Sequence, residues 1–141
     1  MLRTFALGFL ALTSVLRADL SQVRAEPNLE KRSELALEYA NAALNQAKKA
    51  YEETSTDFPT QMDEVRQAVE LSYQSLHDTG KAARRSPKYF KRAEMRMRAL
   101  IKRLDNLERE VGLEDRLPVD EAKKRIIQVH DQVLFDIMSK K

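Results

Sequence analysis

Apolar side chains recur at alternating spacings of three and four residues in four stretches of the chain. The clearest stretch lies within residues 87–111, and its recurring positions are Phe90, Ala93, Met97, Leu100, Leu104, Leu107 and Val111. This spacing places all of these side chains on one stripe of an α-helix, where they can pack against a neighbouring helix. The pattern therefore predicts long amphipathic helices that pack on one another.

The other three stretches predict helices over about residues 29–53, 60–84 and 118–139. Their stripes are Ala36, Ala40, Ala43, Ala47 and Ala50 in the first, Met62, Val65, Val69, Ser72 and Leu76 in the second, and Val119, Ala122, Ile126, Val129, Val133 and Ile137 in the third. Alanine is the strongest helix former, so the first stretch is well suited to a helix. Short joints between helices favour antiparallel neighbours. We therefore expect an all-α fold, arranged as an antiparallel four-helix bundle.

Residues with strong preferences for helix ends mark the expected boundaries. Ser86 precedes a proline, which predicts a helix that begins at the proline with the serine hydroxyl as its cap. Thr60 and Asp63 have the spacing of a capping box. Gly112 is placed to end a helix in the left-handed conformation. Gly80 leaves two alternatives open: either the second helix ends there and a linker follows, or the helix continues through it at a cost of about 1 kcal/mol relative to alanine.

The first 25 residues have the features of a secretory signal peptide. Arg3 precedes a twelve-residue apolar run from Phe5 to Leu16, and Val23 and Ala25 occupy the −3 and −1 positions of a cleavage site. Twelve helical residues span about 18 Å, which is short of the roughly 30 Å hydrocarbon core of a bilayer. We therefore expect a signal peptide over 1–25, a single helical domain over 26–141, and a periplasmic or secreted location.

Two alternatives to this interpretation remain open. The apolar run ends nine residues before Ala25, which is a long separation, and cleavage after Ala18 would shorten it but would place the bulky Leu16 at the −3 position. The segment could also be retained as an amphipathic first helix that packs on the bundle.

Composition excludes several kinds of chemistry. The 141 residues include no cysteine, which excludes disulfides, thiolate metal sites and thiol catalysis. Both histidines, His77 and His130, are followed by aspartate, but Gln74 and Ile127 stand where a di-iron bundle needs glutamate. No Gly-x-Ser-x-Gly nucleophile motif occurs. We therefore expect no enzyme activity, no catalytic residue, no metal and no cofactor.

Charge is unevenly distributed along the chain although the net charge is only +3. Residues 81–103 carry ten basic side chains and one acidic side chain, whereas residues 26–80 carry five basic and eleven acidic ones. One interpretation is an exposed surface for an anion or an acidic partner; the other is neutralisation by the acidic helices beside it. The candidate anion- or partner-binding residues are Arg84, Arg85, Lys88, Lys91, Arg92, Arg96, Arg98, Lys102 and Arg103.

These features predict an exported, non-enzymatic helical-bundle protein that acts by binding. The expected partner is an unidentified protein or an anionic component of the cell envelope, with no membrane span after cleavage, and the bundle is also compatible with a homo-oligomer. A nucleic acid is not favoured, because export separates the protein from cytoplasmic nucleic acid. The alternatives are a protein that binds anionic membranes or nucleic acid, and a cytoplasmic coiled-coil scaffold that retains residues 1–25.

Overall fold

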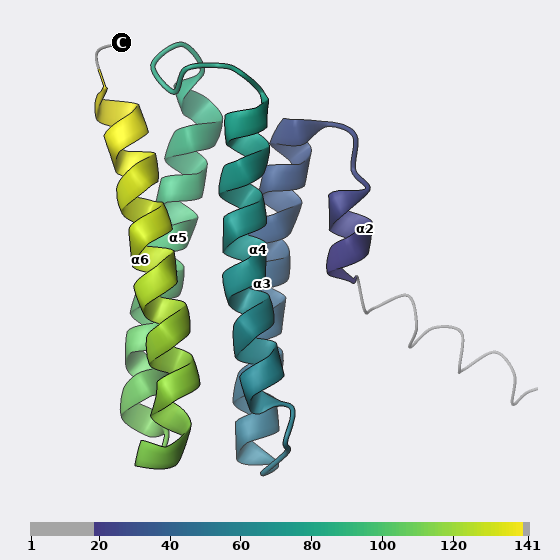
Figure 1. Ribbon diagram of the computed structural model, residues 1–141, viewed down its shortest axis with the longest axis vertical. Coiled ribbons are helices and arrows are strands. Elements are labelled where there is room, and N and C mark those ends of the chain that lie inside the picture. Colours follow the sequence, from purple (N-terminus) through teal and green to yellow (C-terminus); the bar gives the residue numbers. More distant parts are fainter. Residues whose placement is uncertain (1–18, 140–141) are drawn as a thin grey trace, which may run out of the picture.

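The computed structural model describes residues 19–139, and every regular element within that range is a helix (Figure 1). A short 3-10 turn over Leu113–Asp115 precedes the last helix. The α-helices are α2 (Leu20–Arg24), α3 (Leu29–Glu52), α4 (Phe58–Asp78), α5 (Pro87–Glu110) and α6 (Arg116–Met138). The prediction of an all-α chain is confirmed. Three of the long helices begin and end within two residues of the predicted bounds, whereas α4 ends six residues before the predicted end at residue 84.

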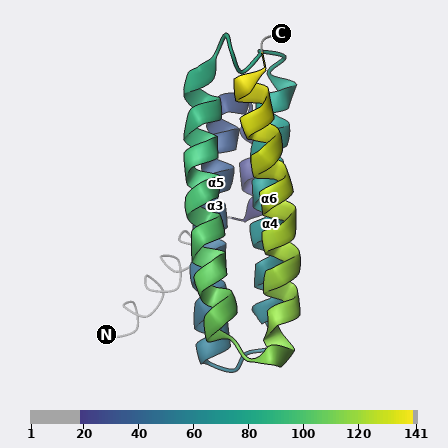
Figure 2. The same cartoon turned by 90° about the vertical axis from the view of Figure 1, so that its left-hand side faces the viewer.

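The long helices lie side by side as two layers. Figure 2 shows α5 and α6 in front of α3 and α4, and α3 contacts α4 and α5 while α6 contacts α5 and α4. Successive long helices are joined at alternate ends of the molecule (Figure 1). The short helix α2 contacts α3 and α4, on the side away from α5 and α6 (Figure 1).

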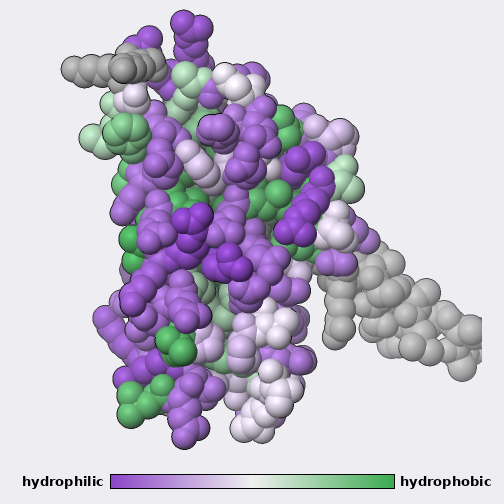
Figure 3. All heavy atoms as spheres, in the orientation of Figure 1, coloured by the Kyte–Doolittle hydropathy of each residue, from purple (hydrophilic) through white to green (hydrophobic). Residues whose placement is uncertain are grey.

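The core consists of the apolar stripes that the sequence predicts. Ala36, Ala40 and Ala47 of α3 are completely buried, and the small alanine side chains let the backbone of α4 approach closely. The stripe positions of α4 and α5 are all buried, including Ser72. In α6 the stripe is buried as far as Val133 and only half-buried at its last position. In the view of Figure 3, hydrophilic residues cover most of the exterior, with smaller hydrophobic patches between them.

The second predicted helix is displaced towards the N-terminus. It begins at Phe58 rather than at residue 60, because the Phe58 side chain is only 2% exposed and belongs to the core. The predicted capping box is wrong, since the N-cap position is Asp57 and the carboxylate of Asp63 accepts hydrogen bonds from Arg66 and Gln67 instead.

The two glycines at helix ends behave differently from one another. Helix α4 ends at Asp78, and Gly80 has a φ of +68°, so the alternative of an early end followed by a linker is the right one. The expected left-handed cap at Gly112 is wrong: its φ is −67°, and Val111 ends α5 in an extended conformation. Ser86 is the N-cap residue of α5 as predicted, although its hydroxyl makes no capping hydrogen bond.

Helix α2 lies within the stretch that the sequence analysis assigns to a signal peptide. Its two apolar residues, Leu20 and Val23, are 5% and 6% exposed and belong to the same core as the long helices. The rest of the predicted leader, residues 1–18, lies outside the described part of the chain.

Candidate functional site

The predicted basic residues occupy the α4–α5 loop and the outward faces of α5. Because the apolar stripe of α5 faces the core, its lysines and arginines are left on the remaining faces of the helix. Arg84 and Arg85 lie in the loop, and the other seven predicted residues lie on α5 between Lys88 and Arg103. The structure divides eight of these nine residues into three groups according to what they contact, and Lys102 belongs to none of the three.

The first group reaches across to the polar face of α3. The guanidinium of Arg92 lies 2.8 Å from a carboxylate oxygen of Glu34, and Arg96 donates to the backbone carbonyl of the same residue at 3.4 Å. Further along the pair of helices, Arg103 donates to the side-chain carbonyl of Asn41 at 2.7 Å. These three arginines connect α5 to α3, but only Arg92 is paired with an acidic side chain; the partners of Arg96 and Arg103 are uncharged.

The second group surrounds a buried carboxylate. Glu94 of α5 is 8% exposed, and it accepts hydrogen bonds from Arg98 at 2.7 and 3.0 Å. The Nε2 atom of His130 on α6 lies 3.0 Å from the same carboxylate. Hydrogen bonding from Arg98 lowers the pKa of Glu94, burial opposes this effect, and the His130 contact lowers the pKa further. Sequence analysis did not identify this cluster, although Glu94 is the one acid among residues 81–103 and lies four positions before Arg98.

The third group remains exposed at one end of the molecule. Lys81, Arg84 and Arg85 line a hollow of about 490 Å³ in the α4–α5 loop. Lys88 and Lys91 follow on the first turns of α5 and are exposed. We call Arg84, Arg85, Lys88 and Lys91 the basic corner.

Three residues of the basic corner, Arg85, Lys88 and Lys91, make no ion pair within residues 19–139. The ammonium group of Lys88 lies 5.6 Å from the centre of the Tyr89 ring. Lys81, beside the corner, pairs with Glu30 at 2.8 Å. Lys102, further along α5, is exposed and likewise has no carboxylate partner among the described residues.

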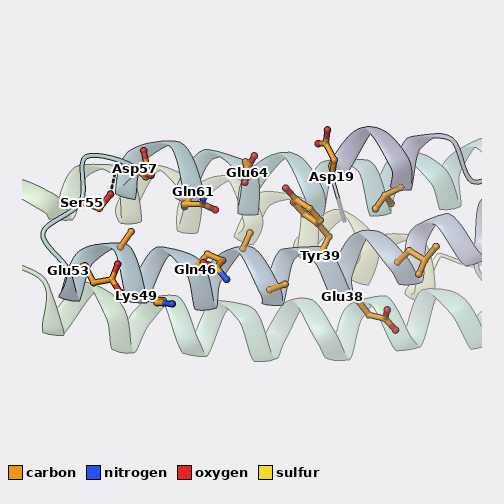
Figure 4. A pocket seen from close by; sticks show the side chains of 15 residues that line it. Asp19, Glu38, Tyr39, Gln46, Lys49, Glu53, Ser55, Asp57, Gln61 and Glu64 are labelled. Carbon is orange, nitrogen blue, oxygen red and sulfur yellow. Dashed lines mark hydrogen bonds between the residues drawn. The ribbon is translucent and has the colours of Figure 1, made fainter. Parts of the chain in front are cut away.

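A larger groove of about 730 Å³ runs between α3 and α4, on the side that carries α2 (Figure 4). Its lining includes small apolar side chains such as Ala42 and Ala43. Lys49 is the one basic residue among the described residues that line the groove. The acidic residues of the lining are Asp19, Glu38, Glu53, Asp57 and Glu64. The excess of negative charge in this lining disfavours the binding of anions in the groove.

Tyr39 lies at the end of this groove where α2 begins. Burial and the nearby carboxylates of Glu64 and Asp19 raise the pKa of the Tyr39 hydroxyl to about 12, while a hydrogen bond from the backbone of Leu20 opposes the rise. Sequence analysis did not anticipate the groove, because the residues that line it come from three helices whose mutual packing no spacing rule gives.

In residues 19–139, no group of three or more histidine, aspartate or glutamate side chains is arranged to hold a metal ion. No helix in the same range is both long enough and apolar enough to cross a membrane. The sequence matches no family model, and it matches neither a curated protein nor a solved structure.

Proposed function

We propose that the protein is an exported, non-enzymatic, antiparallel four-helix bundle that binds an anionic partner through its basic corner. The observation that supports this proposal is the division of the basic segment. Arg92, Arg96 and Arg103 contact α3. The four residues of the basic corner are exposed, and Arg84 and Arg85 line a hollow. Charges that stabilise the contacts between helices cannot serve a partner equally well, so the exposed group carries the proposed binding function.

The position of the corner favours an anion for electrostatic reasons. Positive side chains at a helix N-terminus oppose the helix dipole, which costs a few tenths of a kcal/mol for each charge. Lys88 and Lys91 lie within the first turns of α5 and no acidic residue is present in its first turn. A bound anion removes this repulsion and interacts favourably with the dipole as well. The expected partner is an acidic protein or an anionic component of the cell envelope.

The direct test compares two sets of glutamine substitutions. Replacement of Arg84, Arg85, Lys88 and Lys91 should lower the salt concentration that elutes the protein from immobilised heparin, because exposed charge pairs are screened by salt. Replacement of Arg92, Arg96 and Arg103, which already have partners on α3, should change elution much less. Circular dichroism checks that both variants keep their helices.

The proposal is wrong if the corner variant elutes with the native protein while the control variant elutes early. Vesicles that contain anionic phospholipid, and short duplex DNA, serve as additional probes in the same salt series. Tighter retention on either probe than on heparin would favour the alternative of a membrane-binding or nucleic-acid-binding protein.

A further inference from the structure

We propose that the leader is removed between Ala18 and Asp19, so that the mature protein begins at Asp19 and keeps α2. This inference rests on the proposed export, and it differs from the sequence-based expectation of cleavage after Ala25. Cleavage is hydrolysis of one peptide bond by a leader peptidase of the host: water adds across the bond, leaving a carboxylate on Ala18 and an amino group on Asp19.

The first argument is that α2 is built as part of the folded domain. Asp19 is its N-cap residue, and the carboxylate accepts from the backbone and the hydroxyl of Ser21 at 3.4 and 2.9 Å. Leu20 and Val23, three residues apart, turn the same face of this helix towards the core and are 5% and 6% exposed. Removal of residues 1–25 would discard both side chains and leave the surface that they cover exposed to solvent.

The second argument is the way in which α2 is attached to the long helices. At its N-terminal end the segment packs through Leu20, which belongs to the same core as the long helices, and α2 contacts both α3 and α4. At the other end of the segment, Arg32 Nε donates to the backbone carbonyl of Glu26 at 2.8 Å and holds the turn between α2 and α3. The segment is therefore fixed to the bundle at both ends.

The third argument comes from the leader itself. The apolar run ends at Leu16, so that one residue separates it from Ala18, whereas eight separate it from Ala25. A cleavage site normally follows the apolar region closely and has a small residue at the −1 position. Ala18 meets both conditions, although Leu16 at −3 is larger than the usual residue there.

The test is the mass of the mature protein after expression of the full chain in a bacterium with an intact export pathway. A mature N-terminus at Asp19 supports the inference. An N-terminus at Glu26, or at any position other than Asp19 beyond the initiator methionine, overturns the inference but leaves the proposed export standing. An intact chain that begins at Met1 or Leu2 overturns the inference, and its recovery in the cytoplasmic fraction overturns the proposed export as well.

A matched pair of substitutions provides the second arm. Ala18→Phe places a large side chain at the −1 position, so at least half of the exported chain should accumulate as uncleaved precursor. Ala25→Phe should be processed like the native chain, and Ala25 is exposed, so phenylalanine there does not disturb packing. The opposite result, with accumulation only for the Ala25 variant, would overturn the inference.

Discussion

The hydroxyl oxygens of Ser33 and Ser72 lie 2.8 Å apart in the core between α3 and α4. Ser33 is 2% exposed and Ser72 is completely buried. Each hydroxyl gives the other a partner where water has no access, and no buried side-chain nitrogen or oxygen in the described part of the chain lacks a partner. The two hydroxyls can satisfy each other only when Ser33 lies opposite Ser72, so this hydrogen bond favours one register of α3 on α4.

Substitution of one serine in this pair is expected to be more costly than substitution of both. Ser33→Ala should lower the free energy of unfolding by about 1–3 kcal/mol, because it leaves the Ser72 hydroxyl buried without a partner. The double variant with Ser72→Ala should recover most of this loss, because an apolar pair replaces a polar pair. Urea denaturation of the three variants gives the interaction energy, and strictly additive losses would contradict the prediction.

The buried Glu94 carboxylate should make the free energy of unfolding depend on pH in the acidic range. Its pKa is lowered in the folded protein, chiefly by Arg98, so its contribution is fully present above the ordinary pKa of about 4.5 and is lost as pH falls through the lowered value. Glu94→Gln should reduce the free energy of unfolding at pH 7 by about 1–2 kcal/mol. The variant should also lose less stability than the native protein between pH 5 and pH 3, as thermal melts at each pH would show.

Two glycines form a matched pair for a backbone test. Gly80 has a φ of +68°, a conformation that alanine adopts only with strain, and nothing lies within 4 Å of the position that a β-carbon would take. Gly80→Ala should therefore destabilise the protein by about 1 kcal/mol through the backbone alone. Gly112→Ala, at a φ of −67° and with equally open surroundings, should be neutral or slightly stabilising. Equal effects of the two substitutions on Tm would contradict this account.

Tyr73, which connects α4 to α6, should ionise at a higher pH than an ordinary tyrosine. The hydroxyl of Tyr73 donates to Asp136 at 2.9 Å, and burial together with this carboxylate raises its pKa from 10.0 to about 12. The contribution of the neutral hydroxyl to stability is therefore complete below pH 10 and is lost as pH rises through about 12. Absorbance at 295 nm should show that Tyr73→Phe removes a phenolate transition near pH 12, whereas a loss near pH 10 would contradict the prediction.

The sequence predicts the interior of each long helix well and its ends poorly. Leu100 and Leu104 are buried as their spacing requires, because one helix period decides which face is apolar. The start of α4 depends instead on the packing of Phe58 into the core, which draws the helix upstream of Thr60. The end of α5 depends on how the chain continues into the 3-10 turn at Leu113, a choice that the preference of a single glycine does not determine.

The sequence predicts which residues of the candidate site are charged, but it does not predict which partners their side chains contact. Sequence shows that residues 81–103 are basic, yet it does not show that Arg92 meets Glu34, because 58 positions separate the two residues. The same limit hides the contact between Glu94 and His130, which belong to different helices. Only the packing of α5 against α3 and α6 decides which basic side chains of the segment contact another helix and which do not.

The alanine stripe of α3 has a consequence for the order in which parts of the molecule open. An alanine side chain has no torsion angle to immobilise, so its burial costs no side-chain conformational entropy. The alanines of α3 therefore enter the core without that cost, whereas each buried leucine and methionine must be fixed in one rotamer. In amide hydrogen exchange, the last protected amides should accordingly belong to the α3–α4 hairpin.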